Sequence, residues 1–199
     1  DDTEDTEDTD DTQDTDDTNT TDNTPPEIDE AFVGPNPATV EDTLVCIEGT
    51  VTDDGGASNV SLAYRWFVNG VPNGESGMSL LGSLVSKGQS IKCRITPNDG
   101  FVDGASVESN TLVISNALPT VQTASITPAT PSASDTLLCA SSGFSDADGD
   151  PDLSTFEWLV DGNVVGTGAT LSNGFSSGDG VTCRITPNDG DDSGTPVSS

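Results

Sequence analysis

Apolar and polar residues alternate along several short segments of the chain, and these segments come in two matching sets. The apolar positions of the first set are Leu44, Cys46, Tyr64, Trp66, Val68, Ile91, Cys93 and Ile95. Those of the second set are Leu137, Cys139, Phe156, Trp158, Val160, Val181, Cys183 and Ile185. A period of two places every second side chain on one face of a β-strand. The pattern therefore predicts strands with one buried face in both halves of the chain, and no helical periodicity accompanies it.

The two sets belong to an internal repeat. The letters CRITPNDG at residues 93–100 return unchanged at residues 183–190. Upstream, DTLVC at 42–46 matches DTLLC at 135–139, and YRWFVNG at 64–70 matches FEWLVDG at 156–162. The Asn-Gly and Asp-Gly pairs that end the last match are hairpin signals, because these residues tolerate a positive φ. A period of about 90 residues is typical of whole small domains rather than of solenoid repeats.

Four cysteines divide between the two repeats. Cys46 and Cys93 are 47 residues apart, and Cys139 and Cys183 are 44 residues apart. This spacing predicts one disulfide within each repeat. Closing a loop of that length stabilises a domain by about 4 kcal/mol in the chain-entropy model. Disulfides persist in oxidising compartments, so we expect the protein to be extracellular or on a cell surface.

Each repeat has a cysteine, a tryptophan about twenty residues later, and a second cysteine, which resembles the immunoglobulin-like fold. The PNDG and DADGD turns resemble PKD-like repeats of bacterial secreted surface proteins. The tyrosine corner of antibody-type domains is missing, since Ile91 and Val181 stand two residues before the second cysteines. The resemblance implies an all-β fold of two tandem Ig-like β-sandwiches, at residues 27–116 and 117–199. Only residues 116–119 are free between them, so we expect a stiff rod.

The two repeats differ at their ends. After the PNDG turn the first repeat continues through residues 110–116 as a final strand, while the second stops at residues 197–199. One interpretation is that the second domain lacks its last strand and accepts a strand from another chain. The other is that the chain was cut there or continues further. No donor strand can be named, because residues 28–33 serve as the first strand of the first domain.

Residues 1–26 form an acidic tail in which threonine recurs at every third position up to residue 24. Residues 1–24 hold twelve acids and no large apolar residue. A three-residue period matches an extended polyproline II helix and aligns the threonines on one edge. We expect O-linked sugars there, against the alternative of a plain solvated linker. The candidate glycosylation residues are Thr3, Thr6, Thr9, Thr12, Thr15, Thr18, Thr21 and Thr24, with N-linked candidates at Asn19 and Asn59.

The charge of the chain limits its partners. There are 35 acidic and 5 basic residues, which excludes a nucleic-acid groove or an anionic membrane surface. No stretch is apolar enough to span or insert into a membrane. The chain begins at Asp1 rather than methionine, so we expect a processed or partial chain.

Candidate chemistry is sparse. The carboxylates of Asp146, Asp148 and Asp150 alternate in a turn and are Ca²⁺ candidates, with an ordinary acidic turn as the alternative. Glu157 falls at the position of the twelfth ligand of an EF-hand loop, but Pro151 replaces the glycine of that loop. There is no histidine, and no pair of nucleophile and base can be assembled, so we expect no enzyme activity and no required cofactor.

The architecture as a whole resembles bacterial extracellular fibrils built of Ig-like domains and sugar-coated, threonine-rich segments. This resemblance implies a structural fibre subunit whose partners are copies of itself, joined by tail and domain contacts or by strand donation. The alternative is a surface stalk or adhesin fragment whose Ig-like modules bind a glycan or a protein. We expect a fibre subunit to elongate, and a stalk module to stay monomeric.

Overall fold

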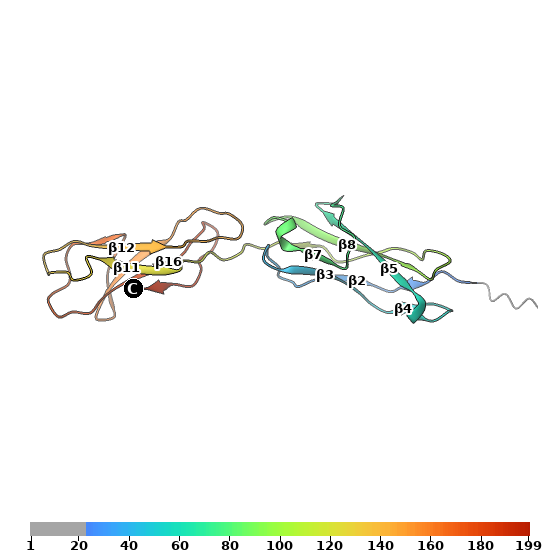
Figure 1. The fold of residues 1–199 in the computed structure, drawn as a ribbon, viewed down its shortest axis with the longest axis horizontal. Helices are drawn as coiled ribbons and strands as arrows, with labels where there is room; N and C mark the ends of the chain where they lie inside the picture. The colour runs from blue at the N-terminus through green and yellow to red at the C-terminus, as the bar shows by residue number, and fades with distance from the viewer. Residues whose placement is uncertain (1–22) are drawn as a thin grey trace, which may run out of the picture.

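The structure is a computed structural model that describes residues 23–199, and these residues form two β-sandwiches lying end to end (Figure 1). The all-β, tandem Ig-like prediction is confirmed. The polyproline II prediction for the tail lies outside the described residues, apart from the last few positions before the first strand. Within residues 23–199 no helix is long and apolar enough to cross a membrane.

The first sandwich consists of two main sheets. One sheet has the order β2-β3-β7, from β2 (Ala31–Gly34), β3 (Thr43–Glu48) and β7 (Ser79–Leu81). The other has the order β10-β8-β5-β6, from β10 (Leu112–Val113), β8 (Ser90–Asn98), β5 (Ser61–Val68) and β6 (Val71–Pro72). Smaller elements complete it: β9 (Val107–Glu108) on β8, the pair β1 (Glu27–Ile28) and β4 (Val51–Thr52), and the 3-10 helices η1 (Ala57–Asn59) and η2 (Gly82–Leu84).

The second sandwich repeats this arrangement. One sheet has the order β11-β12-β15, from β11 (Thr123–Thr127), β12 (Leu137–Ser142) and β15 (Thr170–Leu171). The other has the order β14-β13-β16-β17, from β14 (Asn163–Thr167), β13 (Thr155–Val160), β16 (Val181–Thr186) and β17 (Val197–Ser198). All these strand pairs are antiparallel, as in an Ig-like sandwich.

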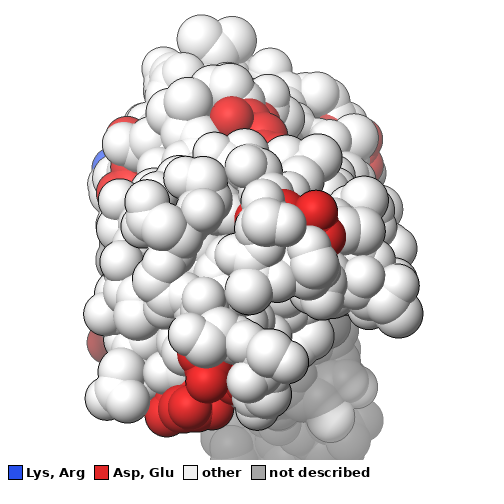
Figure 2. Space-filling model, turned by 90° about the vertical axis from the view of Figure 1, so that its left-hand side faces the viewer, with Lys and Arg blue, Asp and Glu red and all other residues white. Residues whose placement is uncertain are grey.

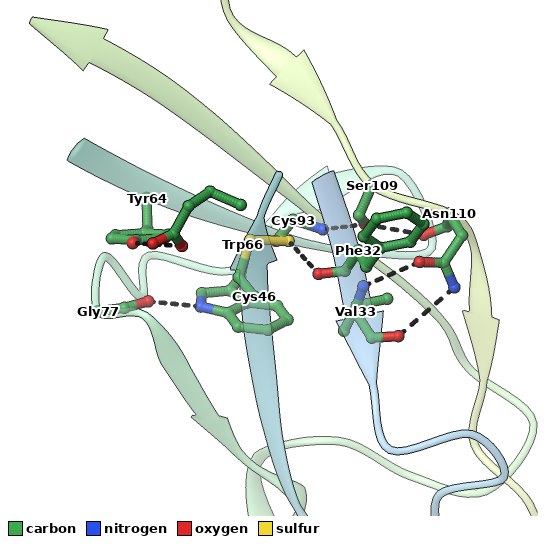
Figure 3. Close-up of a disulfide and its surroundings, with 10 residues drawn as sticks. Phe32, Val33, Cys46, Tyr64, Trp66, Gly77, Cys93, Ser109 and Asn110 are labelled. Carbon is green, nitrogen blue, oxygen red and sulfur yellow. Dashed lines mark hydrogen bonds between the residues drawn. A yellow bond between two sulfur atoms is a disulfide. The ribbon is translucent and has the colours of Figure 1, made fainter. Parts of the chain in front are cut away.

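A disulfide joins the two sheets of each sandwich. Cys46 on β3 bonds to Cys93 on β8, and Cys139 on β12 bonds to Cys183 on β16, so both predicted pairings are confirmed. Each central tryptophan is completely buried beside its disulfide, with Trp66 shown in Figure 3. The Trp66 indole Nε1–H donates to the Gly77 carbonyl at 2.8 Å, so burial leaves no polar group of the ring without a partner.

Both hairpin predictions are also confirmed. Asn69 and Gly70 have φ values of 50° and 78° between β5 and β6. Asp161 and Gly162 have φ values of 49° and 80° between β13 and β14. Two consecutive residues with positive φ match the right-handed twist of the flanking strands, which is why Asn-Gly and Asp-Gly pairs stand there.

Candidate functional site at the junction of the two sandwiches

The segment that links the two sandwiches is fixed to the second one by hydrogen bonds. The Asn116 side-chain amide donates to Asp189 Oδ2 at 2.8 Å and to Asp192 Oδ2 at 3.3 Å. The next backbone amide, of Ala117, donates to Asp148 Oδ2 at 2.6 Å. The linker residue and its neighbour are therefore held by carboxylates from the two loops that precede β13 and follow β16.

A lysine of the first sandwich reaches across to the same loops. Lys87 lies in the loop between η2 and β8, and its ammonium donates to Asn116 Oδ1 at 3.0 Å and to Asp191 Oδ2 at 2.6 Å. It also pairs with Asp150. Hydrogen bonds to Asp150 and then Asp191 raise the pKa of Lys87 above its ordinary range. The Lys87 ammonium thus connects the end of the first sandwich nearest the linker to the acidic loops of the second sandwich.

Asp189 is the most deeply placed of these carboxylates. Its residue is only 4% exposed, which is rare for an aspartate without partners. Its Oδ1 accepts the backbone N–H groups of Asp191 at 2.8 Å and Asp192 at 2.7 Å. The Asn116 amide and these N–H groups favour the charged form and lower the pKa of Asp189 to about 2. The ionised carboxylate is therefore built into the turn.

The predicted cation ligands only partly come together. Carboxylate oxygens of Asp146, Asp150 and Asp189 lie within 4.8 Å of one another. Asp148 instead faces the linker, through its bond to Ala117. One buried oxygen of Asp146 and one of Asp148 accept no hydrogen bond within the described residues. The arrangement offers hard oxygen atoms of the kind Ca²⁺ prefers, and Ca²⁺ binding here stays a prediction.

Glu157 does not complete an EF-hand-like ligand set. It lies on β13, where its Oε2 accepts Arg184 Nε at 2.9 Å from the neighbouring strand β16. Glu157 and Arg184 are direct cross-strand partners in the register. The carboxylate therefore serves a surface ion pair on the sheet.

The start of the first sandwich repeats the way in which the linker is held. The Asn23 amide donates to Asp99 Oδ2 at 2.8 Å, as Asn116 donates to Asp189. The Thr24 amide N–H donates to Asp54 Oδ2 at 3.1 Å. At the end where the chain enters each sandwich, acidic side chains therefore bind an asparagine of the preceding segment.

Most candidate glycosylation residues lie outside the described part of the chain. These are Asn19 and the seven candidate threonines from Thr3 to Thr21. Thr24 is described and exposed. Asn59 is exposed in η1, where its side-chain amide donates to the Gly55 carbonyl at 2.6 Å. Modification of these residues stays a prediction.

Sequence reasoning found the acidic turn but missed the rest of the junction. The sequence gives no reason to single out Lys87 or to pair Asn116 with a carboxylate, and it places Asp189 within the second PNDG turn. One signal was available: an asparagine stands three residues before a proline at the start of each repeat, as Asn23 and Asn116 do. No pattern pointed to Lys87, because a single lysine in a loop is ordinary.

Comparisons with known proteins add little to this description. No protein-family model and no curated protein matches the chain. One matching solved chain is described as "Structural basis for Dscam isoform specificity"; it is 15% identical, with a TM-score of 0.28 over 89% of this chain and 45% of that one. The present chain therefore spans less than half the length of that protein. A TM-score this low carries no argument, so the Ig-like assignment rests on strand order and disulfides.

Proposed function

We propose that this chain is a non-enzymatic, extracellular structural module that acts as a stiff two-domain rod. The observation that carries the proposal is the junction, where Lys87, Asn116 and Ala117 bind carboxylates of the second sandwich. A flexible tether between independent domains has no need of such contacts, since linkers of that kind remain solvated. The two disulfides support an oxidising location.

In its more specific form the proposal is a fibre subunit that joins copies of itself. Three features support it. The two sandwiches lie end to end (Figure 1), and the described chain begins beside Asp54 and Asp99, at the end of the first sandwich away from the second. The tail sequence carries periodic threonines suited to sugars. A tail of this composition shields a filament and repels other anionic surfaces.

The experiment combines mass and assembly. The intact mass of the protein from its native source is measured before and after chemical deglycosylation, against 20.3 kDa for the bare polypeptide. Excess mass that maps to residues 3–24 supports the glycosylated tail, and the bare mass contradicts it. Negative-stain electron microscopy of the same sample then decides the assembly, because filaments support a fibre subunit and single particles contradict it.

A surface stalk or adhesin is the second candidate, and an exposed apolar face favours it. The outer face of the β2-β3-β7 sheet presents Phe32, Ile47 and Leu81, which are 44%, 48% and 56% exposed. Phe32 and Ile47 are direct cross-strand partners. Contiguous apolar side chains on an exposed face are typical of protein-binding surfaces. A Phe32→Ser, Ile47→Ser variant that loses binding to its native cell surface, while wild type remains monomeric, would favour the stalk over the fibre.

Ca²⁺ at the junction is tested separately by titration. If Ca²⁺ binds Asp146, Asp150 and Asp189, millimolar Ca²⁺ raises the unfolding temperature of the second sandwich, because a ligand that binds only the folded state stabilises it. An Asp146→Asn variant should lose this response, and a Glu157→Gln variant should keep it. An unchanged unfolding temperature in Ca²⁺ and in EDTA would contradict Ca²⁺ binding at these carboxylates.

A further inference from the structure

Three of the five basic residues of the chain lie on one face of the first sandwich. Arg65 is on β5, and Lys92 and Arg94 are at alternating positions of the neighbouring strand β8. The residues between them, Trp66 and Cys93, point into the core, so the three cations point outward. Positive charge therefore gathers on the outer face of this sheet, in a chain that has 35 acidic residues. We call Arg65, Lys92 and Arg94 the basic patch.

A single carboxylate serves two of these cations. Glu108 on β9 accepts Arg94 Nη2 at its Oε1 at 2.6 Å, and Lys92 Nζ at its Oε2 at 3.5 Å. Hydrogen bonds from Arg94 and then Lys92 lower the pKa of Glu108, so this carboxylate is ionised and already shared. Arg65 is exposed and has no carboxylate partner among residues 23–199. The described part of the chain therefore leaves positive charge on the patch without a counter-charge.

The two arginines of the patch stand directly opposite each other. Arg65 and Arg94 are cross-strand partners in the register of β5 and β8. Like charges at directly opposite positions destabilise a sheet. The Arg94 guanidinium also lies over the Phe67 ring, 4.9 Å from its centroid, beside a hollow of about 330 Å³ that Phe67, Lys92 and Glu108 help to line. An anionic group placed here would relieve the repulsion between the arginines.

The second sandwich shows the same face without the excess charge. The repeat aligns Arg94 with Arg184, and Arg65 with Glu157. Glu157 and Arg184 are cross-strand partners, and Arg184 Nε donates to Glu157 Oε2 at 2.9 Å. At this place an arginine meets a carboxylate in the second sandwich and another arginine in the first. The sandwich fold therefore does not require the arginine pair, which points to a ligand.

We propose that the basic patch is the docking site for the acidic tail, residues 1–22, of a second copy of this chain. Residues 1–24 hold twelve acids and no base, and each of the first six triplets contains an aspartate, so a carboxylate is available to the patch in any register. Complementary charge supplies the attraction, and several weak ion pairs together supply the affinity. The proposal rests on the proposed fibre subunit and names the surface at which one subunit holds the tail of the next.

Acidic side chains separate the tail of a chain from its own patch. The described chain starts at Asn23, whose amide is bound to Asp99 directly after β8. Asp103 lies beside this point and accepts the Asn98 amide at 2.7 Å. A tail that turned back along β8 would pass both carboxylates and be repelled by them. The tail of another copy can approach the patch from the opposite end of β8.

Cross-linking with a carbodiimide tests the contact in the full chain, because this reagent joins carboxylates to ammonium groups at zero length. The chain has two lysines, Lys87 and Lys92. A mixture of unlabelled and isotope-labelled protein should give cross-links between residues 1–22 and Lys92 that combine a labelled with an unlabelled peptide. Cross-links from Lys87 to Asp150 or Asp191 report that the reagent has worked. Tail cross-links to Lys92 within one chain only, or none, would overturn the proposal.

A labelled peptide of residues 1–24 measures the affinity by fluorescence anisotropy as full-length protein is added. Binding should saturate, and it should weaken about tenfold when the salt concentration is raised tenfold, since salt screens exposed charge pairs. A control peptide with Asn and Gln in place of Asp and Glu should not bind. Absence of saturable binding of the first peptide up to millimolar protein would contradict the docking site.

Charge variants locate the binding on the protein. Arg65→Gln should weaken binding of the peptide about fivefold, and Arg65→Glu, which copies the ion pair of the second sandwich, about 20-fold. Arg184→Gln is the matched control, because it removes one positive charge outside the patch and should leave binding unchanged. Circular dichroism verifies that the variants fold. Equal binding to wild type and to Arg65→Glu would sink the assignment of the patch.

Dextran sulfate serves as the probe for a different polyanion. If it binds wild type but not Arg65→Glu, and the tail peptide binds neither, the patch serves an anionic glycan and its assignment to the tail is wrong. Electron microscopy separates the docking site from the fibre. Filaments that form equally well from wild type and Arg65→Glu would keep the fibre and overturn the docking site. Mixed cross-links to Lys92 in a sample of single particles would contradict the fibre and keep the docking site.

Discussion

The same eight residues, CRITPNDG, occupy two different environments in this molecule. In the second sandwich Asp189 is buried under the linker, and the Asn116 amide comes first among the groups that lower its pKa. In the first sandwich Asp99 is half-buried, and the N–H groups of Val102 and Phe101 are the main cause of its lowered pKa. The turn geometry is local and repeats, while the burial of its carboxylate depends on what lies above it.

The opposite ends of the two sandwiches, which carry the loop before β8 in the first and before β16 in the second, differ more. The loop that presents Lys87 in the first sandwich has Ser177 at the equivalent position in the second. Figure 2 shows acidic side chains on the far end of the molecule, which lies at the left of Figure 1. The second sandwich contains no lysine and a single arginine, Arg184, which pairs with Glu157. A copy placed beyond the second sandwich would meet no ammonium there, so the junction within the chain does not by itself explain assembly between chains.

The largest expected effect comes from removing the disulfides. The paired variants Cys46→Ala with Cys93→Ala, and Cys139→Ala with Cys183→Ala, should each lose about 4 kcal/mol of unfolding free energy. Urea unfolding followed by tryptophan fluorescence measures this, because each sandwich has one tryptophan.

Each transition is assigned to one sandwich by leaving a single tryptophan in the chain. Trp158→Phe is added to the Cys46→Ala, Cys93→Ala variant, and Trp66→Phe is added to the Cys139→Ala, Cys183→Ala variant. A loss below about 1 kcal/mol in either sandwich would contradict the role given to its disulfide.

A smaller difference should separate two core positions, one in each sandwich. Ile114→Ala should destabilise the first sandwich by about 3 kcal/mol, because the side chain is almost completely buried. Val181→Ala in the second should cost about 1 kcal/mol, because part of that side chain is already in water. Urea unfolding measures both. Equal losses would mean that Val181 is as deeply buried in solution as Ile114.

Lys87→Met should loosen the junction without unfolding either sandwich. The three hydrogen bonds of the ammonium are lost, while the methionine retains the apolar stem. Small-angle X-ray scattering should show a wider distribution of interatomic distances, at unchanged unfolding midpoints. Lys92→Met is the matched control, since Lys92 pairs with Glu108 inside the first sandwich. An identical scattering profile for wild type and Lys87→Met would show that the linker alone holds the rod.

The mildest change is expected from acid. The pKa of Asp189 falls from 3.8 to about 2 on folding, so its contribution is present above pH 3.8 and lost as the pH falls through about 2. The unfolding temperature should therefore fall more steeply between pH 5 and pH 2 for wild type than for Asp189→Asn. Asp99→Asn gives the corresponding comparison for the first sandwich, where Asn23 takes the place of Asn116. Parallel pH profiles for wild type and Asp189→Asn would contradict the role of this carboxylate.

Much of the fold follows from the sequence alone. The period of two locates the strands around both tryptophans, the Asn69-Gly70 and Asp161-Gly162 pairs locate the hairpins, and the cysteine spacing gives the disulfides. These features are determined locally, because alternation and positive φ depend on residues within one strand or turn. The exact repeat then fixes the second sandwich once the first is recognised.

The junction was decided only by the tertiary structure. Lys87 meets Asp191 across 104 residues of sequence, and Asn116 meets Asp189 across 73. No periodicity in the sequence predicts either pair, because each forms only where the short linker brings the two folded sandwiches together. The sequence by itself determined which residues form strands and turns. Which carboxylates become buried, and whether a core is covered, depends on chain segments that meet only after folding, because burial is a property of the packed molecule.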